Sequence, residues 1–99
     1  MNVHPQVYIV CYDIGAPARL RKVFQIVRSW GDHLQDSVFR CALSPRQLAA
    51  LKGELMEVLH HTEDQVMFVP VGRPDGPAEK RIFTLGQPLL HAERVCRVF

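Results

Sequence analysis

The sequence lacks any apolar run long enough to cross a membrane, and it lacks a secretory leader at its start. A bilayer-spanning helix needs about 20 consecutive apolar residues, and every apolar stretch of this chain is far shorter. The first five residues, Met1-Asn-Val-His-Pro5, have neither the basic start nor the small-residue cleavage site of a signal peptide. The sequence alone therefore predicts a cytoplasmic protein with no membrane partner.

Cysteine pairs and a strong charge of one sign are also missing. The three cysteines, Cys11, Cys41 and Cys96, stand far apart with no C-x-x-C pair, so neither a zinc ribbon nor a dithiol redox motif is indicated. An odd number of scattered cysteines is typical of reduced, packed thiols. Twelve basic residues stand against 10 acidic ones, for a net charge of +2. Nucleic-acid binding would therefore require local clustering of basic residues.

What is present is the composition of one small folded domain. The chain has 99 residues, of which 47% are hydrophobic and 22% are charged. These values are typical of globular proteins and exclude a wholly disordered chain. We expect a single domain over residues 1–99, with its core between about residues 5 and 86.

Hydrophobic periodicity and turn residues divide the chain into alternating strands and helices. The patterns predict strands over residues 7–14 and 33–43, the second with a bend at Asp36-Ser37, and a helix over 17–30 between them. Ser44-Pro-Arg-Gln47 has the form of a capping box and opens a second helix, which we expect to end near Leu59. After it we expect strands over residues 66–71, 82–85 and 93–99, with a loop over 72–80.

This order predicts an α+β fold. If the bend at Asp36-Ser37 is a hairpin, the elements run β-α-β-β-α-β, which is the ferredoxin-like sandwich, here with an extra C-terminal strand over about residues 93–99. The two helices would cover one face of the sheet. Because residues 7–12 are apolar on both faces, the other face predicts a homodimer formed through the sheet.

Asp13 is the sharpest chemical feature, because it is the only charged residue of the first strand and lies at its end. Carboxylate oxygens are the ligands that Mg²⁺ and Mn²⁺ prefer, and loops after strands often carry functional groups. A twofold dimer could bring two copies of Asp13 together. The alternative is structural: Asp13 caps the following loop or the N-terminus of the first helix.

The first helix is basic, and this indicates a nucleic-acid interface. Guanidinium groups match phosphate oxygens with a rigid fork of donors. The candidate phosphate-binding residues are Arg19, Arg21, Lys22 and Arg28, and Arg40 and Arg46 could extend their surface. The alternative is a solvated helix face opposite the core. Tyr12, Ser37 and Phe39 are possible supporting residues, although the aromatic side chains are more typical of a core or an interface than of base stacking.

Three segments in this order resemble one known family. They are Val7-Tyr-Ile-Val-Cys-Tyr-Asp-Ile14 with its basic helix, Gln35-Asp-Ser-Val-Phe39, and Leu43-Ser-Pro-Arg-Gln-Leu48. The chain resembles the small CRISPR-associated adaptation protein, the second of the two universal CRISPR proteins. The likeness runs from about Val7 to Val71 and more loosely to Phe99.

The resemblance implies a ferredoxin-like homodimer in which Asp13 is the divalent-metal ligand, with Mg²⁺ or Mn²⁺ as cofactor. It implies a role in spacer acquisition and a metal-dependent endonuclease acting on RNA or duplex DNA. It also implies the alternative, a non-catalytic adaptor that binds prespacer duplex DNA and bridges dimers of the CRISPR integrase. The C-terminal strand, Val95–Phe99 here, would pair with the other subunit or dock the integrase.

Overall fold

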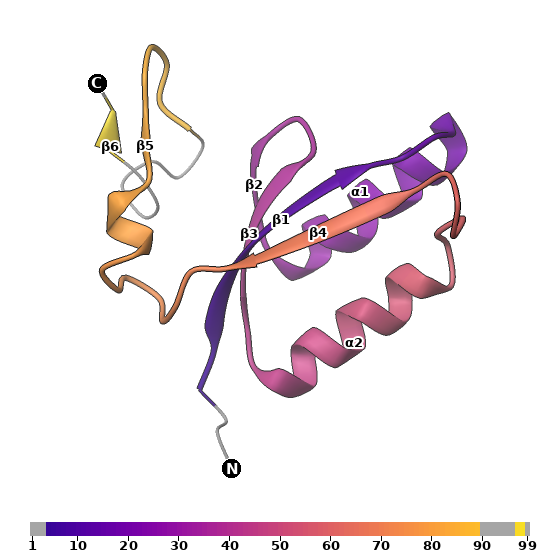
Figure 1. Ribbon diagram of the computed structural model, residues 1–99, viewed down its shortest axis with the longest axis horizontal. Helices are drawn as coiled ribbons and strands as arrows, with labels where there is room; N and C mark the ends of the chain where they lie inside the picture. The colour runs from indigo at the N-terminus through magenta and orange to yellow at the C-terminus, as the bar shows by residue number, and fades with distance from the viewer. Residues whose placement is uncertain (1–3, 90–96, 99) are drawn as a thin grey trace.

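The computed structural model describes residues 4–89 and 97–98. Its main body consists of β1 (Gln6–Asp13), α1 (Pro17–Trp30), β2 (Asp32–Gln35), β3 (Val38–Leu43), α2 (Pro45–Met56) and β4 (Gln65–Pro70). The four strands form an antiparallel sheet in the order β2-β3-β1-β4, with α1 and α2 on one side of it (Figure 1). The ferredoxin-like α+β fold predicted from the sequence is confirmed, including the hairpin at Asp36, whose φ is +26°.

Helix α1 ends at a glycine because the backbone at this point lies very close to β3. Gly31 follows the helix directly in extended backbone, so its role is one of space and not of unusual φ. A Cβ atom at this position would overlap the carbonyl oxygen of Arg40 and lie 2.5 Å from the Sγ atom of Cys41. Only glycine therefore fits where the chain turns from α1 into β2.

Helix α2 begins at the predicted capping box and ends earlier than predicted. The Ser44 hydroxyl accepts a hydrogen bond from the Gln47 amide at 3.2 Å, and the Gln47 side chain accepts one from the Ser44 amide at 2.9 Å. The helix ends at Met56, not near Leu59. The chain tightens after Met56, since the amides of Val58 and Leu59 both donate to the carbonyl of Leu55 at 3.0 Å, and the amide of His60 then donates to the carboxylate of Asp64 at 2.8 Å.

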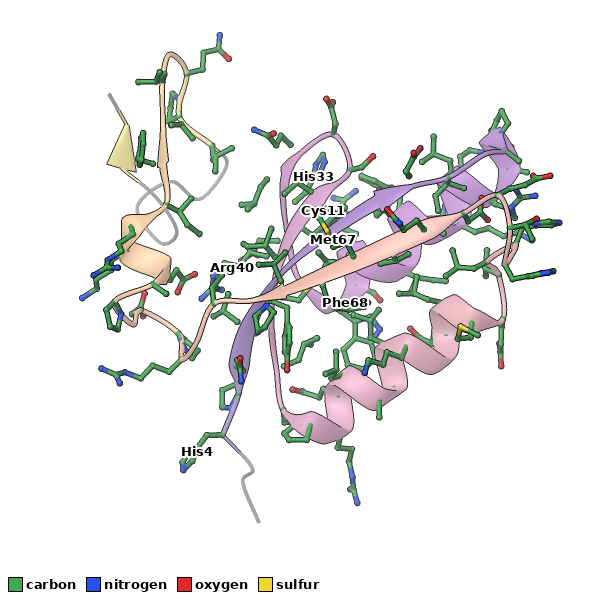
Figure 2. The ribbon with its side chains drawn as sticks, in the orientation of Figure 1. His4, Cys11, His33, Arg40, Met67 and Phe68 are labelled. Carbon is green, nitrogen blue, oxygen red and sulfur yellow. The ribbon has the colours of Figure 1, made fainter. Side chains whose placement is uncertain are left out.

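Alternate residues of the same strands face two different environments. One side packs against the helices in a core formed by Val10, Tyr12, Val23, Val27, Phe39, Cys41, Leu43, Leu51 and Leu55. The other side, which we call the open face, carries Ile9, Cys11, Asp13, Val38, Arg40, Met67 and Val69. Figure 2 shows Cys11 and Met67 next to each other there, as their pairing requires. Met67 is 51% exposed and Val69 is 38% exposed.

The two described cysteines lie on opposite sides of the sheet. Cys41 is fully buried in the core, and Cys11 is half-buried on the open face; both are free thiols. Burial raises the pKa of the Cys41 thiol to about 12 and raises that of Cys11 as well. The prediction of packed thiols is confirmed for Cys41, whereas Cys96 lies outside the described residues.

The chain after β4 forms a small unit to the side of the sheet. It contains the 3₁₀ helix η1 (Glu79–Arg81), which begins within the predicted loop, and the strand β5 (Phe83–Thr84), which is shorter than the predicted strand over residues 82–85. β5 pairs in parallel with β6 (Arg97–Val98) of the same chain (Figure 1). Residues 93–96 and 99 of the predicted C-terminal strand lie outside the described residues, so its pairing with a second subunit or an integrase stays a prediction.

The helices of the described part of the chain are too short or too polar to cross a membrane.

Candidate functional site

Asp13 is the last residue of β1 and projects from the open face. It pairs across the sheet with Gln65, the first residue of β4, and is exposed. Within residues 4–89 and 97–98 its carboxylate has no hydrogen bond or ion pair. The N-cap of α1 is Ala16, with no side-chain cap, so Asp13 does not cap the helix. The structure thus leaves a solvent-facing carboxylate at the end of an apolar surface.

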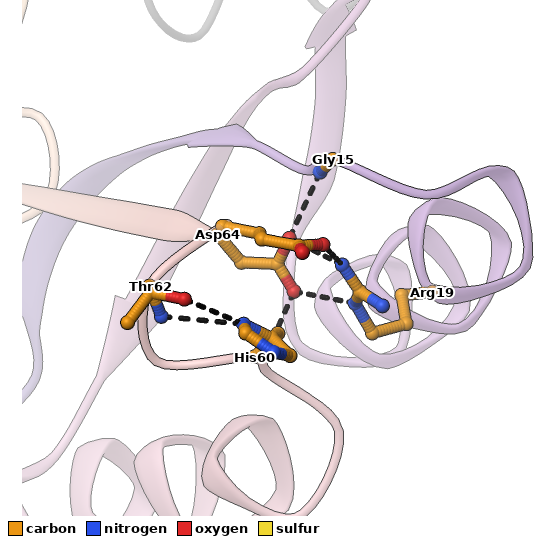
Figure 3. Close-up of polar contacts among 6 residues, drawn as sticks. Gly15, Arg19, His60, Thr62 and Asp64 are labelled. Atoms are coloured by element: carbon orange, nitrogen blue, oxygen red, sulfur yellow. Dashed lines mark hydrogen bonds and ion pairs between the residues drawn. The ribbon is translucent and has the colours of Figure 1, made fainter.

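The capping role that Asp13 could have had belongs to Asp64. Its carboxylate accepts hydrogen bonds from the amides of Gly15 and His60, both at 2.8 Å (Figure 3). The Nε and Nη2 atoms of Arg19 donate to the two Asp64 oxygens at 2.7 and 3.1 Å. Arg19 also pairs with Glu63 at 2.9 Å. One carboxylate therefore holds together the loop after β1, the start of α1 and the segment before β4.

The ionisation of this cluster follows from its contacts. The hydrogen bond from Arg19, helped by the two backbone amides, holds the pKa of Asp64 well below its usual range despite the burial of its side chain. The Asp64 hydrogen bond raises the pKa of Arg19 in return. Arg19 was predicted to bind phosphate, but within the fold its positive charge is already paired with the carboxylates of Asp64 and Glu63.

Sequence reasoning missed Asp64, because its role depends on how β1 and β4 pair. Because β1 and β4 are antiparallel with Asp13 opposite Gln65, the residue before Gln65 must reach the end of β1. The sequence predicts both strands but not their register, and the pairing of Arg19 with Asp64 needs that register.

The remaining basic residues of α1 divide between two surfaces. Arg21, Lys22 and Arg28 are exposed and have no hydrogen bond or ion pair within the described part of the chain. Arg21 and Arg28 lie two helical turns apart and line the same cavity, whereas Lys22 lies on the side that faces Glu54 of α2. Arg46 is exposed on α2.

Arg40 cannot extend this basic surface, because it is buried on the open face and paired there. Its Nε atom donates to the carboxylate of Glu79, and its Nη2 atom donates to the other oxygen at 3.3 Å. Glu79 is fully buried and also accepts from the amide of Asp75 at 2.8 Å. Figure 2 shows Arg40 at the side of the sheet nearest η1. The pair therefore anchors the unit after β4 to the sheet.

A cavity of about 490 Å³ lies between α1 and the β2–β3 turn. Its lining brings together two of the predicted supporting residues, Tyr12 and Ser37, with Arg21 and Arg28. Burial raises the pKa of Tyr12, and a side-chain hydrogen bond with Ser37 opposes that rise. Phe39 is fully buried beneath Tyr12, with ring centroids 6.0 Å apart. The structure thus assigns Phe39 to supporting Tyr12 and not to a surface.

The described residues of one chain offer few ligands for a metal ion. Asp13 offers oxygen atoms of the kind that Mg²⁺ and Mn²⁺ prefer, and it is accessible. Among residues 4–89 and 97–98, the His, Cys, Asp and Glu side chains form no cluster of three or more that could hold a metal ion. The described chain therefore presents one carboxylate ligand from each copy.

Sequence comparison identifies relatives over most of the chain. The family described as "CRISPR associated protein Cas2" matches residues 6–75. A protein of Thermodesulfovibrio yellowstonii named CRISPR-associated endoribonuclease Cas2 2 is 38% identical over 64 residues, covering 65% of this chain and 70% of that protein. The CRISPR-associated endoribonuclease Cas2 of Geobacter sulfurreducens is 31% identical over 80 residues, covering 81% of this chain and 83% of that protein.

Solved structures agree with this match. The crystal structure of Streptococcus pyogenes Cas2 superposes with a TM-score of 0.62 at 30% identity, covering 67% of this chain and 86% of that one. The hypothetical protein TT1823 of Thermus thermophilus superposes with a TM-score of 0.67 at 31% identity, covering 71% of this chain and 85% of that one. The match to more than half of the residues, together with the shared fold, shows that this chain belongs to the Cas2 family of CRISPR-associated proteins.

Proposed function

We propose that this protein is a metal-dependent endonuclease of CRISPR adaptation that cleaves phosphodiester bonds in RNA or duplex DNA as a homodimer. The observation that carries the proposal is the exposed Asp13 carboxylate, which has no described partner and ends an apolar face. The names of the relatives, which are endoribonucleases and endonucleases, support the same reaction class.

The homodimer is supported by the open face. Exposed apolar patches of this kind mark interaction surfaces, and Met67 and Val69 are both more than a third exposed. A second copy seated there by a twofold axis would cover the same residues on both subunits. Asp13 lies at the end of this face, so the same arrangement would bring two Asp13 carboxylates toward one another.

The paired carboxylates would hold Mg²⁺ or Mn²⁺, to which the oxygen ligands of Asp13 are suited. A cation held there would supply Lewis-acid chemistry, either polarisation of the phosphate or activation of water. Asp13 itself holds the cation, and the exposed basic residues Arg21, Lys22 and Arg28 hold the nucleic-acid backbone in place through its phosphates.

A second function, a non-catalytic adaptor, is favoured by a different observation. Three basic side chains of α1, Arg21, Lys22 and Arg28, are exposed and unpaired within the described residues, which suits a surface that holds duplex DNA whatever its sequence. In this function the homodimer would bridge dimers of the CRISPR integrase, and Asp13 would not be needed.

Nuclease assays with Mg²⁺ and with EDTA, run in parallel on the wild type and on Asp13→Asn, separate the two functions. Asn keeps the volume and one carbonyl oxygen but loses the charge that attracts the cation. We expect cleavage only by the wild type with Mg²⁺, and an unchanged circular dichroism spectrum for the variant. Cleavage by Asp13→Asn at the wild-type rate would overturn the role of Asp13. Absence of cleavage by the wild type, with duplex binding retained, would favour the adaptor.

A further inference from the structure

The cavity between α1 and the β2–β3 turn is separate from the Asp13 carboxylate. Tyr12 lines the cavity and belongs to the helix side of the sheet. Asp13, the next residue, projects from the opposite face, as successive strand residues do. The volume of about 490 Å³ lies within the roughly 300–1,000 Å³ of typical small-molecule clefts. The cavity is therefore large enough for a ligand of its own.

One part of the cavity wall is aromatic and held rigidly. Tyr12 is only 8% exposed, and its ring stacks on Phe39 with an interplanar angle of 27°. Phe24, which also lines the cavity, contacts Phe39 edge to face at 5.5 Å. Because the core fixes both rings, a flat ligand would meet an ordered surface, most of it supplied by the half-buried Phe24 and a small part by the buried Tyr12. Nucleic-acid bases bind to such aromatic surfaces by stacking, whatever their sequence.

The rim of the cavity is charged. Arg21 and Arg28 lie roughly 10 Å apart along the axis of α1; both line the cavity and both are exposed. Their guanidinium groups can donate two parallel hydrogen bonds to a phosphate. Asp36 lines the cavity from the β2–β3 turn, where its carboxylate can accept a hydrogen bond from the exocyclic amino group of a base.

We propose that this cavity binds one unpaired nucleotide, with the base against Phe24 beside Tyr12 and a phosphate on Arg28. The inference rests on the proposed function in taking nucleic acid as the ligand, but it requires neither a metal ion nor Asp13. Two sources carry this chemistry: a free mononucleotide, and an unpaired nucleotide within or at the end of a strand.

The first experiment measures binding of adenosine 5′-monophosphate by titration calorimetry in EDTA, with adenosine and inorganic phosphate as partial probes. We expect the mononucleotide to bind more tightly than either part, because only it uses both the rings and the rim. Arg28→Ala should weaken binding about tenfold, the size of one lost charge-assisted hydrogen bond. Lys52→Ala, which removes one positive charge from an exposed position of α2 outside the cavity, should leave binding unchanged.

Two further variants keep the result specific to the cavity. Arg28→Lys retains the charge but not the forked donors. We expect its affinity for the mononucleotide to lie between the affinities of the wild type and of Arg28→Ala. Leu20→Trp enlarges a side chain that lines the cavity and is 40% exposed, so it should block the base while leaving the fold intact by circular dichroism.

The second experiment separates the two sources with labelled duplexes in EDTA, either blunt or carrying one unpaired 3′ nucleotide. Tighter binding of the overhanging duplex, lost in Arg28→Ala, would assign the cavity to a strand. Mononucleotide binding without that preference would assign it to the free nucleotide.

The proposal fails if the wild type neither binds the mononucleotide nor prefers the overhang, or if Arg28→Ala and Lys52→Ala behave alike. That result would leave the Asp13-dependent cleavage assay unaffected. Conversely, cavity binding together with cleavage that survives Asp13→Asn would overturn the role of Asp13 and not the cavity.

Discussion

The two faces of the central sheet are built from the same strands with similar apolar residues, yet their surroundings differ. On the helix side, Val10 and Phe39 are fully buried. On the open face, Cys11 and Met67 occupy the alternate positions of β1 and β4 and keep part of their surface accessible. The alternation of hydrophobic residues along a strand therefore predicts which residues share a face of the sheet. It does not predict whether helices or solvent lie against that face. Asp13 and Arg40 both belong to the open face, so its apolar surface is bordered by charge.

The largest difference between the faces should appear in stability. Phe39→Ala leaves a cavity in the core and should lower the free energy of unfolding by about 3–5 kcal/mol. Met67→Ala should change it by no more than about 0.5 kcal/mol at protein concentrations where the chain is monomeric. Urea unfolding followed by circular dichroism measures both.

The same comparison also tests the homodimer. A dimer adds concentration-dependent stability, so the cost of Met67→Ala should grow as protein concentration rises. If Phe39→Ala and Met67→Ala lowered the free energy of unfolding equally at every protein concentration, the open face would be as well packed in the monomer as the helix side, and the comparison would be wrong.

Introducing a charge on the open face should dissociate the homodimer. Met67→Glu would place two carboxylates in an apolar interface, where unpaired charges are costly. Met56→Glu makes the same change on α2, at a position that is 73% exposed. We expect sedimentation to show a monomer for Met67→Glu and a dimer for Met56→Glu, with metal-dependent cleavage lost only in the first. A dimeric Met67→Glu would place the interface elsewhere.

Much of the fold could be predicted because its signals are local. The Ser44–Gln47 capping box depends on residues three apart, and the bend at Asp36 depends on one turn; both are confirmed. The end of α2 could not be predicted, because no local pattern shows that the amides of Val58 and Leu59 share the carbonyl of Leu55. The need for glycine at position 31 could not be predicted either, because it comes from the close approach of the chain to β3.

The candidate site divides in the same way. Asp13 stands out in the sequence as the single charge of an apolar strand, and the structure leaves it exposed. The basic residues of α1 also stand out, but their different roles depend on tertiary contacts. On α1, Arg19 pairs with Asp64, and on β3 the basic Arg40 pairs with Glu79, each partner more than 35 residues away. Such long-range pairs leave no pattern in a single sequence.

The Arg40–Glu79 pair joins the open face to the unit after β4, and breaking it should be costly. Glu79→Gln would leave the buried guanidinium of Arg40 without its main counter-charge, and we expect a loss of about 3 kcal/mol. Arg73→Gln changes a charge of the same segment at an exposed position and serves as the control. Equal unfolding midpoints for the two variants would show that the pair does not anchor the segment.

The pair should also make stability depend on pH. Burial pushes the pKa of Glu79 up, but the hydrogen bonds from Arg40 and the Asp75 amide outweigh it, so the folded pKa lies below the usual value. This contribution is therefore fully present above the unfolded pKa of about 4.3 and is lost as the pH falls through the folded pKa. Glu79→Gln should flatten the acid limb of the stability profile, and an unchanged limb would contradict the pairing.

The smallest effect concerns where nucleic acid lies relative to the two faces. Arg21 and Lys22 belong to the helix layer, and their charges suit phosphates with no pattern for reading base edges. Replacing both with alanine should weaken duplex binding evenly across sequences and flatten the slope of log K against log salt by about 0.9 for each lost contact. A dimer carries each residue twice, so the double substitution could remove up to about four contacts.

Asp13→Asn, on the open face, should leave the slope nearly unchanged, because its proposed role is metal binding. An unchanged slope in the Arg21/Lys22 variant would assign this part of α1 to solvent and direct the search for the duplex to Arg28 and Arg46.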